Sequence, residues 1–214
     1  MKIKNVVFDF NGTLLNDVEV CFDIEKEMQI REHVSPLLTE EEYFNLFGFP
    51  VRDYYKTIGF DDNKYPELAK LFMKLYHQRW FKESSVYENC EKVLGDLKEK
   101  GYNLYVLSAT EDTFLTKQLQ DIKLLQYFDG TIGSSNIDAK EKISYGKKYL
   151  DEHNVNSEET ILIGDTIHDY ETSKHLGLRC LLFSKGHCSL ERLKKTMMPI
   201  ANSYLEIEDY ILNN

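Results

Sequence analysis

Five short runs of apolar residues recur along the chain, and each ends at small or polar residues. They are residues 6–8, 104–107, 130–132, 161–163 and 180–183. Continuous β-branched and aromatic runs of this length are typical of strands covered on both faces, as in a parallel sheet. The stretches between them carry apolar residues at helical spacing and end at glycines such as Gly101 and Gly177. Strands that alternate with helices predict a doubly wound α/β fold.

Residues 16–83 break this alternation. The stretch contains no convincing strand, but residues 18–28 and 68–80 place apolar side chains at the spacing of one helix face. Gly48-Phe49-Pro50 interrupts the middle, and residues 83–85 suit a returning linker. We therefore predict a helical insertion at 16–83 within an α/β core formed by 1–15 and 84–214.

Composition narrows the possible functions. The 214 residues include 26 Lys and Arg against 36 Asp and Glu, which gives a formal net charge of −10. This acidic balance argues against a nucleic-acid partner, because broad binding to phosphate backbones needs clustered positive charge. No apolar run approaches the ~18 residues of a membrane span, and the start does not resemble a signal peptide. The four cysteines show no CxxC spacing. We expect a cytoplasmic protein with reduced, buried cysteines.

Polar residues follow three of the expected strands directly. The segments are Asp9-Phe10-Asn11-Gly12-Thr13, Ser108-Ala109-Thr110 and Gly164-Asp165-Thr166-Ile167-His168-Asp169. Ligands of open parallel sheets bind outside the carboxyl ends of the strands, so we expect these segments to converge. Asp9 and Asp165 on neighbouring strands would repel each other unless a cation lies between them. Oxygen ligands of this kind favour Mg²⁺.

The same strand ends suit a phosphate. The Gly12-Thr13 turn frees backbone N–H groups that could cradle phosphate oxygens, and the Ser108 hydroxyl could donate to another. A lysine is then needed to neutralise the remaining charge, and Lys140 and Lys142 are the candidates. Separately, Thr110 and Asp138 are interpreted as ordinary helix caps.

The ordered set DFNGTL, VLSAT, a lysine and GDTIHD resembles the haloacid dehalogenase-like hydrolases. These are mostly Mg²⁺-dependent phosphatases that work through an aspartyl-phosphate intermediate. The resemblance covers essentially the whole chain and implies a Rossmann-like core. The insertion after the first motif is similar to the helical cap of phosphoglycolate phosphatase-like members.

The resemblance also implies roles for individual residues. Asp9 would be the nucleophile and a metal ligand, with Asp165 and Asp169 as further metal ligands. Lys142 is preferred over Lys140 as the third motif, although the family's usual Lys-Pro is absent. The phosphoryl group would be held by Gly12, Thr13, Ser108, Ala109 and Lys142. In the cap, Arg52 is the candidate for contacting a small phosphorylated metabolite, and a solvated surface arginine is the alternative.

The chain departs from the family pattern at Asn11. Phosphatases of this family carry a second aspartate there, which protonates the leaving group and later activates water. The Asn11 backbone carbonyl can still bind the metal, but its side chain cannot carry a proton. General acid–base catalysis contributes ~10²–10⁴-fold, so a loss of that size is expected unless something compensates.

Three compensations are open. His168 or His187, both in loops after core strands, could supply the proton. The substrate could have a leaving group that needs no proton. The Asn11-Gly12 pair could deamidate and place an aspartate at position 11 in some molecules.

We therefore expect a Mg²⁺-dependent phosphatase of small metabolites. One alternative is a metal-free dehalogenase, which also lacks the second aspartate, but Asp165 and Asp169 would then repel an anionic substrate. The other is a non-catalytic or weakly active binder of phosphorylated ligands, which Asn11 favours.

Overall fold

The fold was taken from a computed structural model, which describes residues 2–134 and 141–214. The strands are β1 (Asn5–Phe8), β2 (Leu15–Asn16), β3 (Ser85–Val86), β4 (Asn103–Glu111), β5 (Gly130–Ser134), β6 (Thr160–Gly164), β7 (Arg179–Phe183) and β8 (Ile200–Ala201). The helices are α1 (Val18–Arg31), α2 (Glu40–Leu46), α3 (Val51–Thr57), α4 (Tyr65–Glu83), α5 (Cys90–Glu99), α6 (Asp112–Asp121), α7 (Glu141–Glu152), α8 (Ile167–Leu176), α9 (Leu190–Lys194) and α10 (Tyr204–Asn213). Single 3-10 turns lie at Asp62–Lys64, Leu125–Tyr127 and Ser157–Glu159.

Six strands form one sheet in the order β5-β4-β1-β6-β7-β8, and every pairing in it is parallel. The register places Phe8 of β1 beside Val106 of β4 on one side and Ile163 of β6 on the other. The chain segments that leave β1, β4 and β6 therefore emerge at the same edge of the sheet. The predicted doubly wound α/β fold is confirmed.

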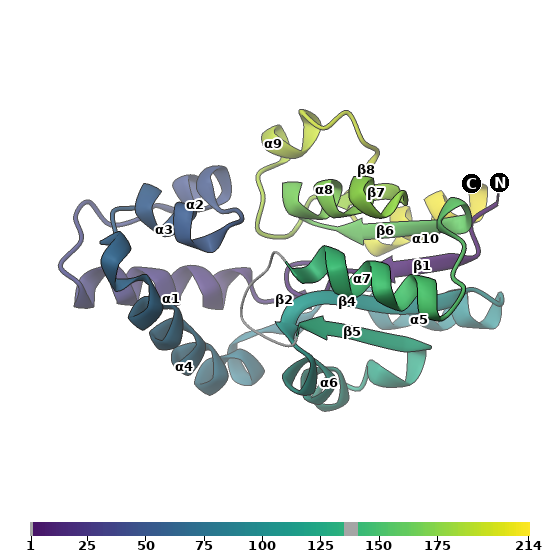
Figure 1. The fold of residues 1–214 in the computed structure, drawn as a ribbon, viewed down its shortest axis with the longest axis horizontal. Coiled ribbons are helices and arrows are strands. Elements are labelled where there is room, and N and C mark those ends of the chain that lie inside the picture. Colours follow the sequence, from purple (N-terminus) through teal and green to yellow (C-terminus); the bar gives the residue numbers. More distant parts are fainter. Residues whose placement is uncertain (1, 135–140) are drawn as a thin grey trace.

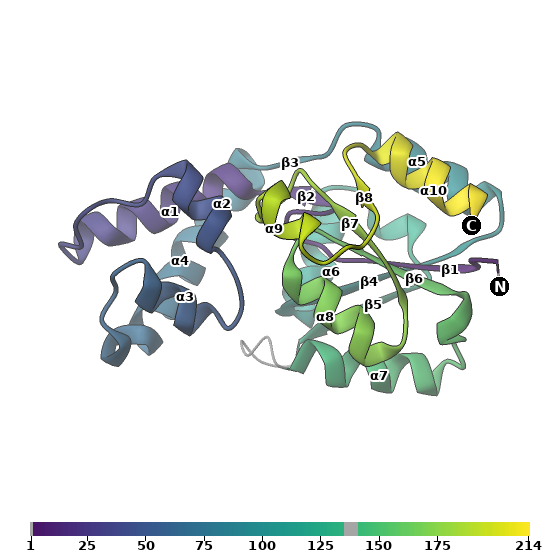
Figure 2. The same ribbon diagram turned by 90° about the horizontal axis from the view of Figure 1, so that it is seen from above.

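Alternate residues of β1 explain why the sheet is covered on both faces. Val6 and Phe8 join an apolar cluster with residues of α5, α6 and α10, whereas Val7 joins a second cluster with residues of α7. Side chains alternate between the faces of a strand, so a run that is apolar at every position needs helices on both sides. Figure 2 shows the sheet between α5 and α10 on one face and α7 and α8 on the other.

The four helices α1 to α4 form a separate helical lobe beside the sheet (Figure 1). The long helices α1 and α4 pack against each other, and α2 and α3 lie nearby. The lobe is joined to the rest of the chain through the antiparallel pair β2–β3, in which Leu15 pairs with Val86 and Asn16 with Ser85. This two-stranded ribbon was not predicted, because two residues are too few to show a strand pattern.

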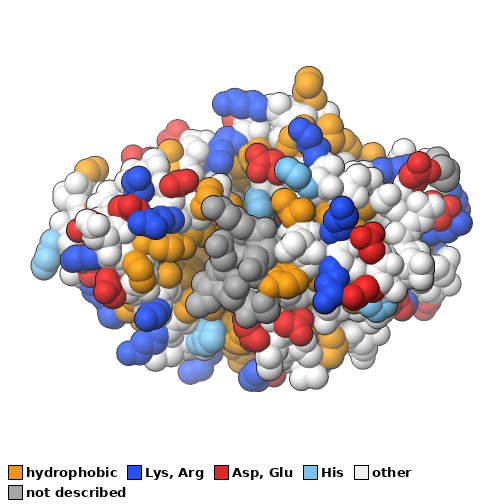
Figure 3. Space-filling model, in the orientation of Figure 1, with side chains coloured by type: hydrophobic (Ala, Val, Ile, Leu, Met, Phe, Trp, Pro, Cys, Tyr) orange, Lys and Arg blue, Asp and Glu red, His pale blue; other side chains and the backbone are white. Residues whose placement is uncertain are grey.

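Charged side chains of both signs are interspersed over the face seen in Figure 3. The chain carries a net charge of −10, but the acidic side chains on this face do not form one continuous patch. Among residues 2–134 and 141–214, no helix combines the length and the apolar content that a membrane span needs.

Candidate active site

Three carboxylates meet where β1 and β6 end. Asp9 directly follows β1, Asp165 directly follows β6, and Asp169 lies in the first turn of α8. One oxygen from each lies within 4.8 Å of the others, and all three residues are buried. The structure therefore brings together the acidic residues that the strand-end argument selected.

Lys142 at the start of α7 lies between two of these carboxylates. Its Nζ is 2.6 Å from Asp9 Oδ1 and 2.7 Å from Asp169 Oδ1, and only 3% of its surface is exposed. Burial alone would lower the pKa of Lys142, but Asp169 and Asp9 raise it above its ordinary value. The lysine is therefore held in its charged form. Its rival Lys140, like the expected cap Asp138, lies outside the described residues.

The charges of this cluster do not balance. Three carboxylates against one ammonium group leave two negative charges uncompensated. Burial, together with repulsion from Asp169 and Asp165, raises the pKa of Asp9, although Lys142 opposes the shift. A buried set of oxygen donors that lacks two positive charges fits a hard divalent cation such as Mg²⁺.

The backbone is shaped around Asp165. The carboxylate accepts hydrogen bonds from the Thr13 hydroxyl at 3.1 Å and from the His187 backbone N–H at 2.6 Å. A Cβ added to Gly12 would lie 2.4 Å from Asp165 Oδ2, and one added to Gly186 would lie 2.1 Å from the same oxygen. Side chains at these positions would collide with the carboxylate, so both glycines let the chain approach it.

The turn after β1 does not leave its N–H groups free for a phosphate, as the sequence had suggested. Gly12 N–H donates to the Leu15 carbonyl at 2.8 Å and to Asp17 Oδ1 at 3.0 Å, while Thr13 N–H contacts the Phe10 carbonyl at 3.3 Å. A buried carboxylate thus occupies the place expected for a phosphate oxygen.

Ser108 and Ala109 lie in β4, at the edge where Asp9 is found. Ser108 is buried and its hydroxyl accepts from the Thr110 N–H at 3.1 Å, whereas Ala109 is half-buried. Thr110 is not the cap of α6 that was expected, because the Glu111 side chain accepts from the first-turn N–H groups instead. The Thr110 hydroxyl donates to Asn11 Oδ1 at 3.0 Å.

The side chain of Asn11 is bound on both of its ends. Its amide nitrogen donates to Asp17 Oδ2 at 2.7 Å and to the Tyr76 hydroxyl at 2.8 Å, and its oxygen accepts from Thr110. The two donor contacts need an amide. An aspartate in this position would present an oxygen to Asp17 where the structure has a donor.

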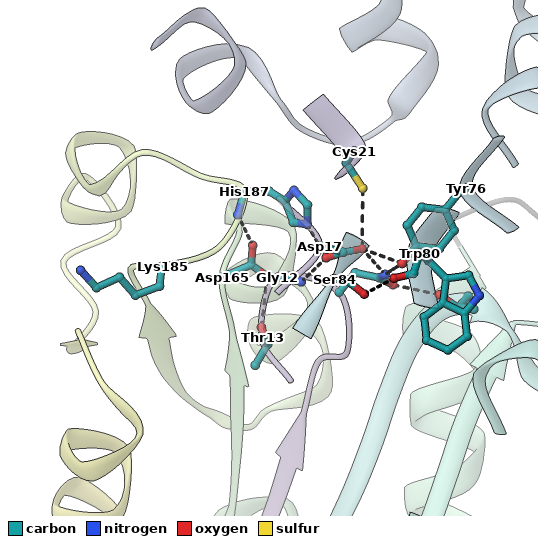
Figure 4. Close-up of polar contacts among 12 residues, drawn as sticks. Gly12, Thr13, Asp17, Cys21, Tyr76, Trp80, Ser84, Asp165, Lys185 and His187 are labelled. Carbon is teal, nitrogen blue, oxygen red and sulfur yellow. Dashed lines mark hydrogen bonds and ion pairs between the residues drawn. The ribbon is translucent and has the colours of Figure 1, made fainter. Parts of the chain in front are cut away.

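Asp17 is the centre of this second network and was not singled out from the sequence (Figure 4). Its side chain is fully buried and accepts from Gly12, Asn11, Tyr76 and His187. Burial alone would raise the pKa of Asp17, but the His187 contact lowers it. The residue occupies the cap position before α1 yet makes no side-chain cap contact there. From sequence an aspartate in this place is simply a helix cap, so no local signal identifies it.

His187 links the sheet and its covering helices, the second lobe of the molecule, to the helical lobe. Its Nε2 donates to Asp17 Oδ1 at 3.1 Å, and its Nδ1 lies 2.7 Å from the Tyr43 hydroxyl of α2. Burial alone would lower the pKa of His187, but Asp17 and then Asp165 raise it to about 9. The other candidate histidine, His168, lies in the first turn of α8 and not in a loop as expected, and the centre of its ring is 4.7 Å from that of the tilted Phe49 ring.

Arg52 contacts other residues of the helical lobe. Its guanidinium pairs with Asp62 at 2.7 Å and lies 5.8 Å from the centre of the Tyr65 ring. None of the contacts described for it reaches the carboxylate cluster, so its role in binding substrate stays a prediction.

Comparison with known proteins identifies the family of the chain. Residues 6–183 match the family model of the haloacid dehalogenase-like hydrolases. The pyrophosphatase PpaX of Bacillus mycoides is 25% identical over 198 residues, which are 91% of each chain. Two solved structures show the same fold. A haloacid dehalogenase-like family hydrolase from Streptococcus pneumoniae has a TM-score of 0.85 at 20% identity, covering 97% of this chain and 98% of its own. A protein described as a predicted phosphatase from Clostridium acetobutylicum has a TM-score of 0.86 at 24% identity over 100% of both chains.

Proposed function

Because this chain belongs to the haloacid dehalogenase-like hydrolase family, we propose that it is a Mg²⁺-dependent phosphatase of small phosphorylated metabolites. Asp9 would carry the phosphoryl group between substrate and water. The observation that supports this most directly is the buried contact of Lys142 with both Asp9 and Asp169, beside Asp165. Such a set provides a nucleophile, a fixed positive charge and oxygen donors for a cation in one place.

Each residue of the set has a distinct task in the proposed reaction. A carboxylate oxygen of Asp9 attacks phosphorus, and the bond from phosphorus to the leaving group breaks. Water then attacks the same phosphorus, the bond from phosphorus to the Asp9 oxygen breaks, and the proton of the water passes to solvent. Lys142 orients Asp9 and offsets negative charge, while Ser108 lies at the same edge to hold a phosphate oxygen. Asp9, Asp165, Asp169 and the Asn11 carbonyl would hold Mg²⁺, which offsets the charge on the transferring group.

Asn11 points to substrates whose leaving group departs without a proton. Its amide is committed to Asp17 and Tyr76, so neither end of the side chain is placed to donate a proton to the leaving group. An alcohol is as weak an acid as water, with a pKa of about 16, whereas a phosphate group loses its second proton at a pKa of about 6. We therefore propose a preference for phosphoanhydrides and other activated phosphates over alkyl phosphate esters. The likeness to a pyrophosphatase supports this preference.

The helical lobe would act as a cap that covers the substrate. It already contacts the start of α9, where the cap residue Ser189 donates its N–H to the Phe44 carbonyl at 2.9 Å. Arg192 of α9 donates to the carbonyls of Phe44 and Phe47 at 3.2 and 2.5 Å. Closure of such a lobe excludes water and selects the leaving group. Arg52 remains the proposed substrate contact from this lobe.

The second candidate function is the binding of phosphorylated ligands without turnover. Asn11 favours it, because its side chain is hydrogen-bonded to Asp17 and Tyr76 and cannot transfer a proton. The test compares pyrophosphate, acetyl phosphate and an alkyl phosphate as substrates, each with and without Mg²⁺. We expect Mg²⁺-dependent release of phosphate from the first two, at least tenfold faster than from the third, and its loss in Asp9→Asn. Binding of these compounds without any turnover would establish the binder, and full Mg²⁺-dependent activity in Asp9→Asn would refute the proposed mechanism.

A further inference from the structure

A second group of metal-binding side chains lies beside the catalytic carboxylates. Asp17, Cys21 and His187 each offer one ligand atom, and these atoms lie within 4.8 Å of one another. All three residues are buried. Figure 4 shows the side chains of Cys21 and His187 next to that of Asp17. The group shares no residue with Asp9, Asp165 and Asp169, and the catalytic roles proposed above do not use it.

The three ligand types differ from those of the carboxylate cluster. A thiol, an imidazole nitrogen and one carboxylate oxygen suit Zn²⁺, whereas Mg²⁺ requires oxygen ligands. We infer that Asp17, Cys21 and His187 form a binding site for Zn²⁺ or a similar thiophilic divalent ion.

The observed spacings are close to those around a zinc ion. Metal–ligand lengths of about 2.3 Å to sulfur and about 2.1 Å to nitrogen or oxygen, at the tetrahedral angle, place sulfur and oxygen about 3.6 Å apart and nitrogen and oxygen about 3.4 Å apart. In the structure Cys21 Sγ lies 3.6 Å from Asp17 Oδ2, and His187 Nε2 lies 3.1 Å from the other oxygen of the same carboxylate, Oδ1. An ion bound to all three side chains would therefore use both Asp17 oxygens or need a rotation of the carboxylate.

Hydrogen bonds from neighbouring residues orient the proposed ligands, as is usual around metal ions in proteins. Metal-bound imidazoles donate their outer N–H to a fixed acceptor, and ligating carboxylates are themselves hydrogen-bonded. The outer nitrogen of His187 lies 2.7 Å from the Tyr43 hydroxyl, and Asp17 accepts from Gly12 and Tyr76 at 3.0 and 2.7 Å. These supports remain available when Nε2 and the sulfur turn to an ion.

The charges of the three side chains allow a zinc ion to replace two protons at this buried site. Without metal, the carboxylate of Asp17 and the imidazolium of His187 cancel, and Cys21 is neutral. With Zn²⁺ bound, His187 and Cys21 each release one proton to solvent, and the ion is balanced by one carboxylate and one thiolate. The net charge of these three residues and the ion is therefore zero in both states, although the loss of the His187 proton removes a positive charge beside Asp165.

The site would tie the two lobes together. Cys21 belongs to α1, Asp17 to the connection before it, and His187 to the loop after β7. An ion bound to all three would restrain the helical lobe against the sheet and press on the backbone that supports Asp165. If the proposed phosphatase function holds, Zn²⁺ should inhibit turnover, and additional Mg²⁺ should not relieve the inhibition.

The test measures binding directly and does not depend on activity. The purified chain is titrated with Co²⁺ in the presence of excess Mg²⁺, which fills the carboxylate cluster, and thiolate-to-cobalt charge-transfer absorption is recorded. We expect one equivalent of tetrahedral Co²⁺, displaced by Zn²⁺, and loss of the band in Cys21→Ser and in Cys21→Ala. Cys180→Ser, which changes another buried cysteine away from the site, is the matched control and should keep the band.

Circular dichroism establishes that each variant is folded before titration. Two different substitutions at Cys21 are used so that the test still stands if one of the two variants does not fold. Absence of a thiolate band in the wild type, or a band that survives both Cys21 variants, would overturn the inference. Loss of the band in Cys188→Ser but not in the Cys21 variants would also overturn it, because the ion would then use the neighbouring cysteine.

Discussion

Replacing Asn11 with aspartate would put two carboxylates in contact inside the protein. The Asn11 amide nitrogen lies 2.7 Å from Asp17 Oδ2, and Asp17 is fully buried. Two unit negative charges at this distance repel by about 6 kcal/mol at an effective dielectric constant of about 20. The new side chain also replaces a donor with an acceptor, so a good hydrogen bond is lost.

A proton limits the cost of this repulsion. An aspartate with an ordinary pKa of about 3.9 can be kept neutral at a cost of about 4 kcal/mol at pH 7 and about 1.5 kcal/mol at pH 5. A neutral carboxyl group at position 11 would donate to Asp17 much as the amide does. We therefore expect Asn11→Asp to lower the free energy of unfolding by about 2–4 kcal/mol at pH 7 and by at most about 1.5 kcal/mol at pH 5.

The sign of the pH dependence follows from linkage. The pKa of the new carboxyl group is raised in the folded state, so its cost is absent below the unfolded pKa and grows as the pH rises toward the folded pKa. Urea denaturation of wild type and variant at pH 5 and pH 7 measures the difference. Asn63→Asp is the matched control, since the Asn63 amide also donates to a carboxylate, Asp61 at 3.1 Å, but is exposed and screened by solvent.

Two results would refute the reasoning. One is a loss below about 1 kcal/mol at pH 7, comparable to Asn63→Asp, and the other is an equal loss at both pH values. The exchange Asn11→Asp with Asp17→Asn provides a further check. It returns one amide and one carboxylate to the pair and should recover only part of the lost stability, because the amide at position 17 can donate to the carboxylate at position 11 but no longer offers His187 a charged partner.

Three further predictions follow from the same contacts. Lys142→Met removes the only cation found between the described carboxylates of the cluster, so phosphatase turnover should fall by at least about 100-fold and the variant's melting temperature should rise more with Mg²⁺ than that of the wild type. The raised pKa of His187 stabilises the fold below its unfolded value of about 6.5, so unfolding experiments should show wild-type stability falling by about 3 kcal/mol as the pH rises through about 9, and His187→Gln should lack this slope. Gly186→Ala places a methyl group 2.1 Å from an oxygen of Asp165 and should weaken Mg²⁺ activation of turnover by about 10–100-fold, whereas Gly95→Ala, whose Cβ meets only ordinary contacts at 3.7 Å, should leave it unchanged.

Local pattern was sufficient for most of the fold. The apolar run at 104–107 predicted β4, which extends over Asn103–Glu111, and the run at 161–163 predicted β6 over Thr160–Gly164. A strand that is buried on both faces carries apolar residues at nearly every position, so its sequence is easily identified. The short strand β8 (Ile200–Ala201) was missed, because it pairs only with the end of β7 and carries no pattern of its own.

The candidate site divides in a similar way. Asp9, Asp165 and Lys142 could be selected because each lies at a strand end or helix start that the pattern locates. The contacts of Asp17 could not, because they join residues distant in sequence, such as Tyr76 in α4 and His187 after β7. The same network overturned the expectation that Gly12 would offer its N–H to a phosphate.

The sequence by itself determined the α/β core, the helical insertion and the residues that meet at the carboxyl ends of the strands, because periodicity and strand-end chemistry are local. Only the tertiary structure decided what surrounds them. It placed a buried carboxylate where a phosphate was expected, held Asn11 as a donor to that carboxylate, and brought His187 and Cys21 beside it. Such contacts depend on how the two lobes pack, and the free energy of burying charge then selects which side chains can share that space.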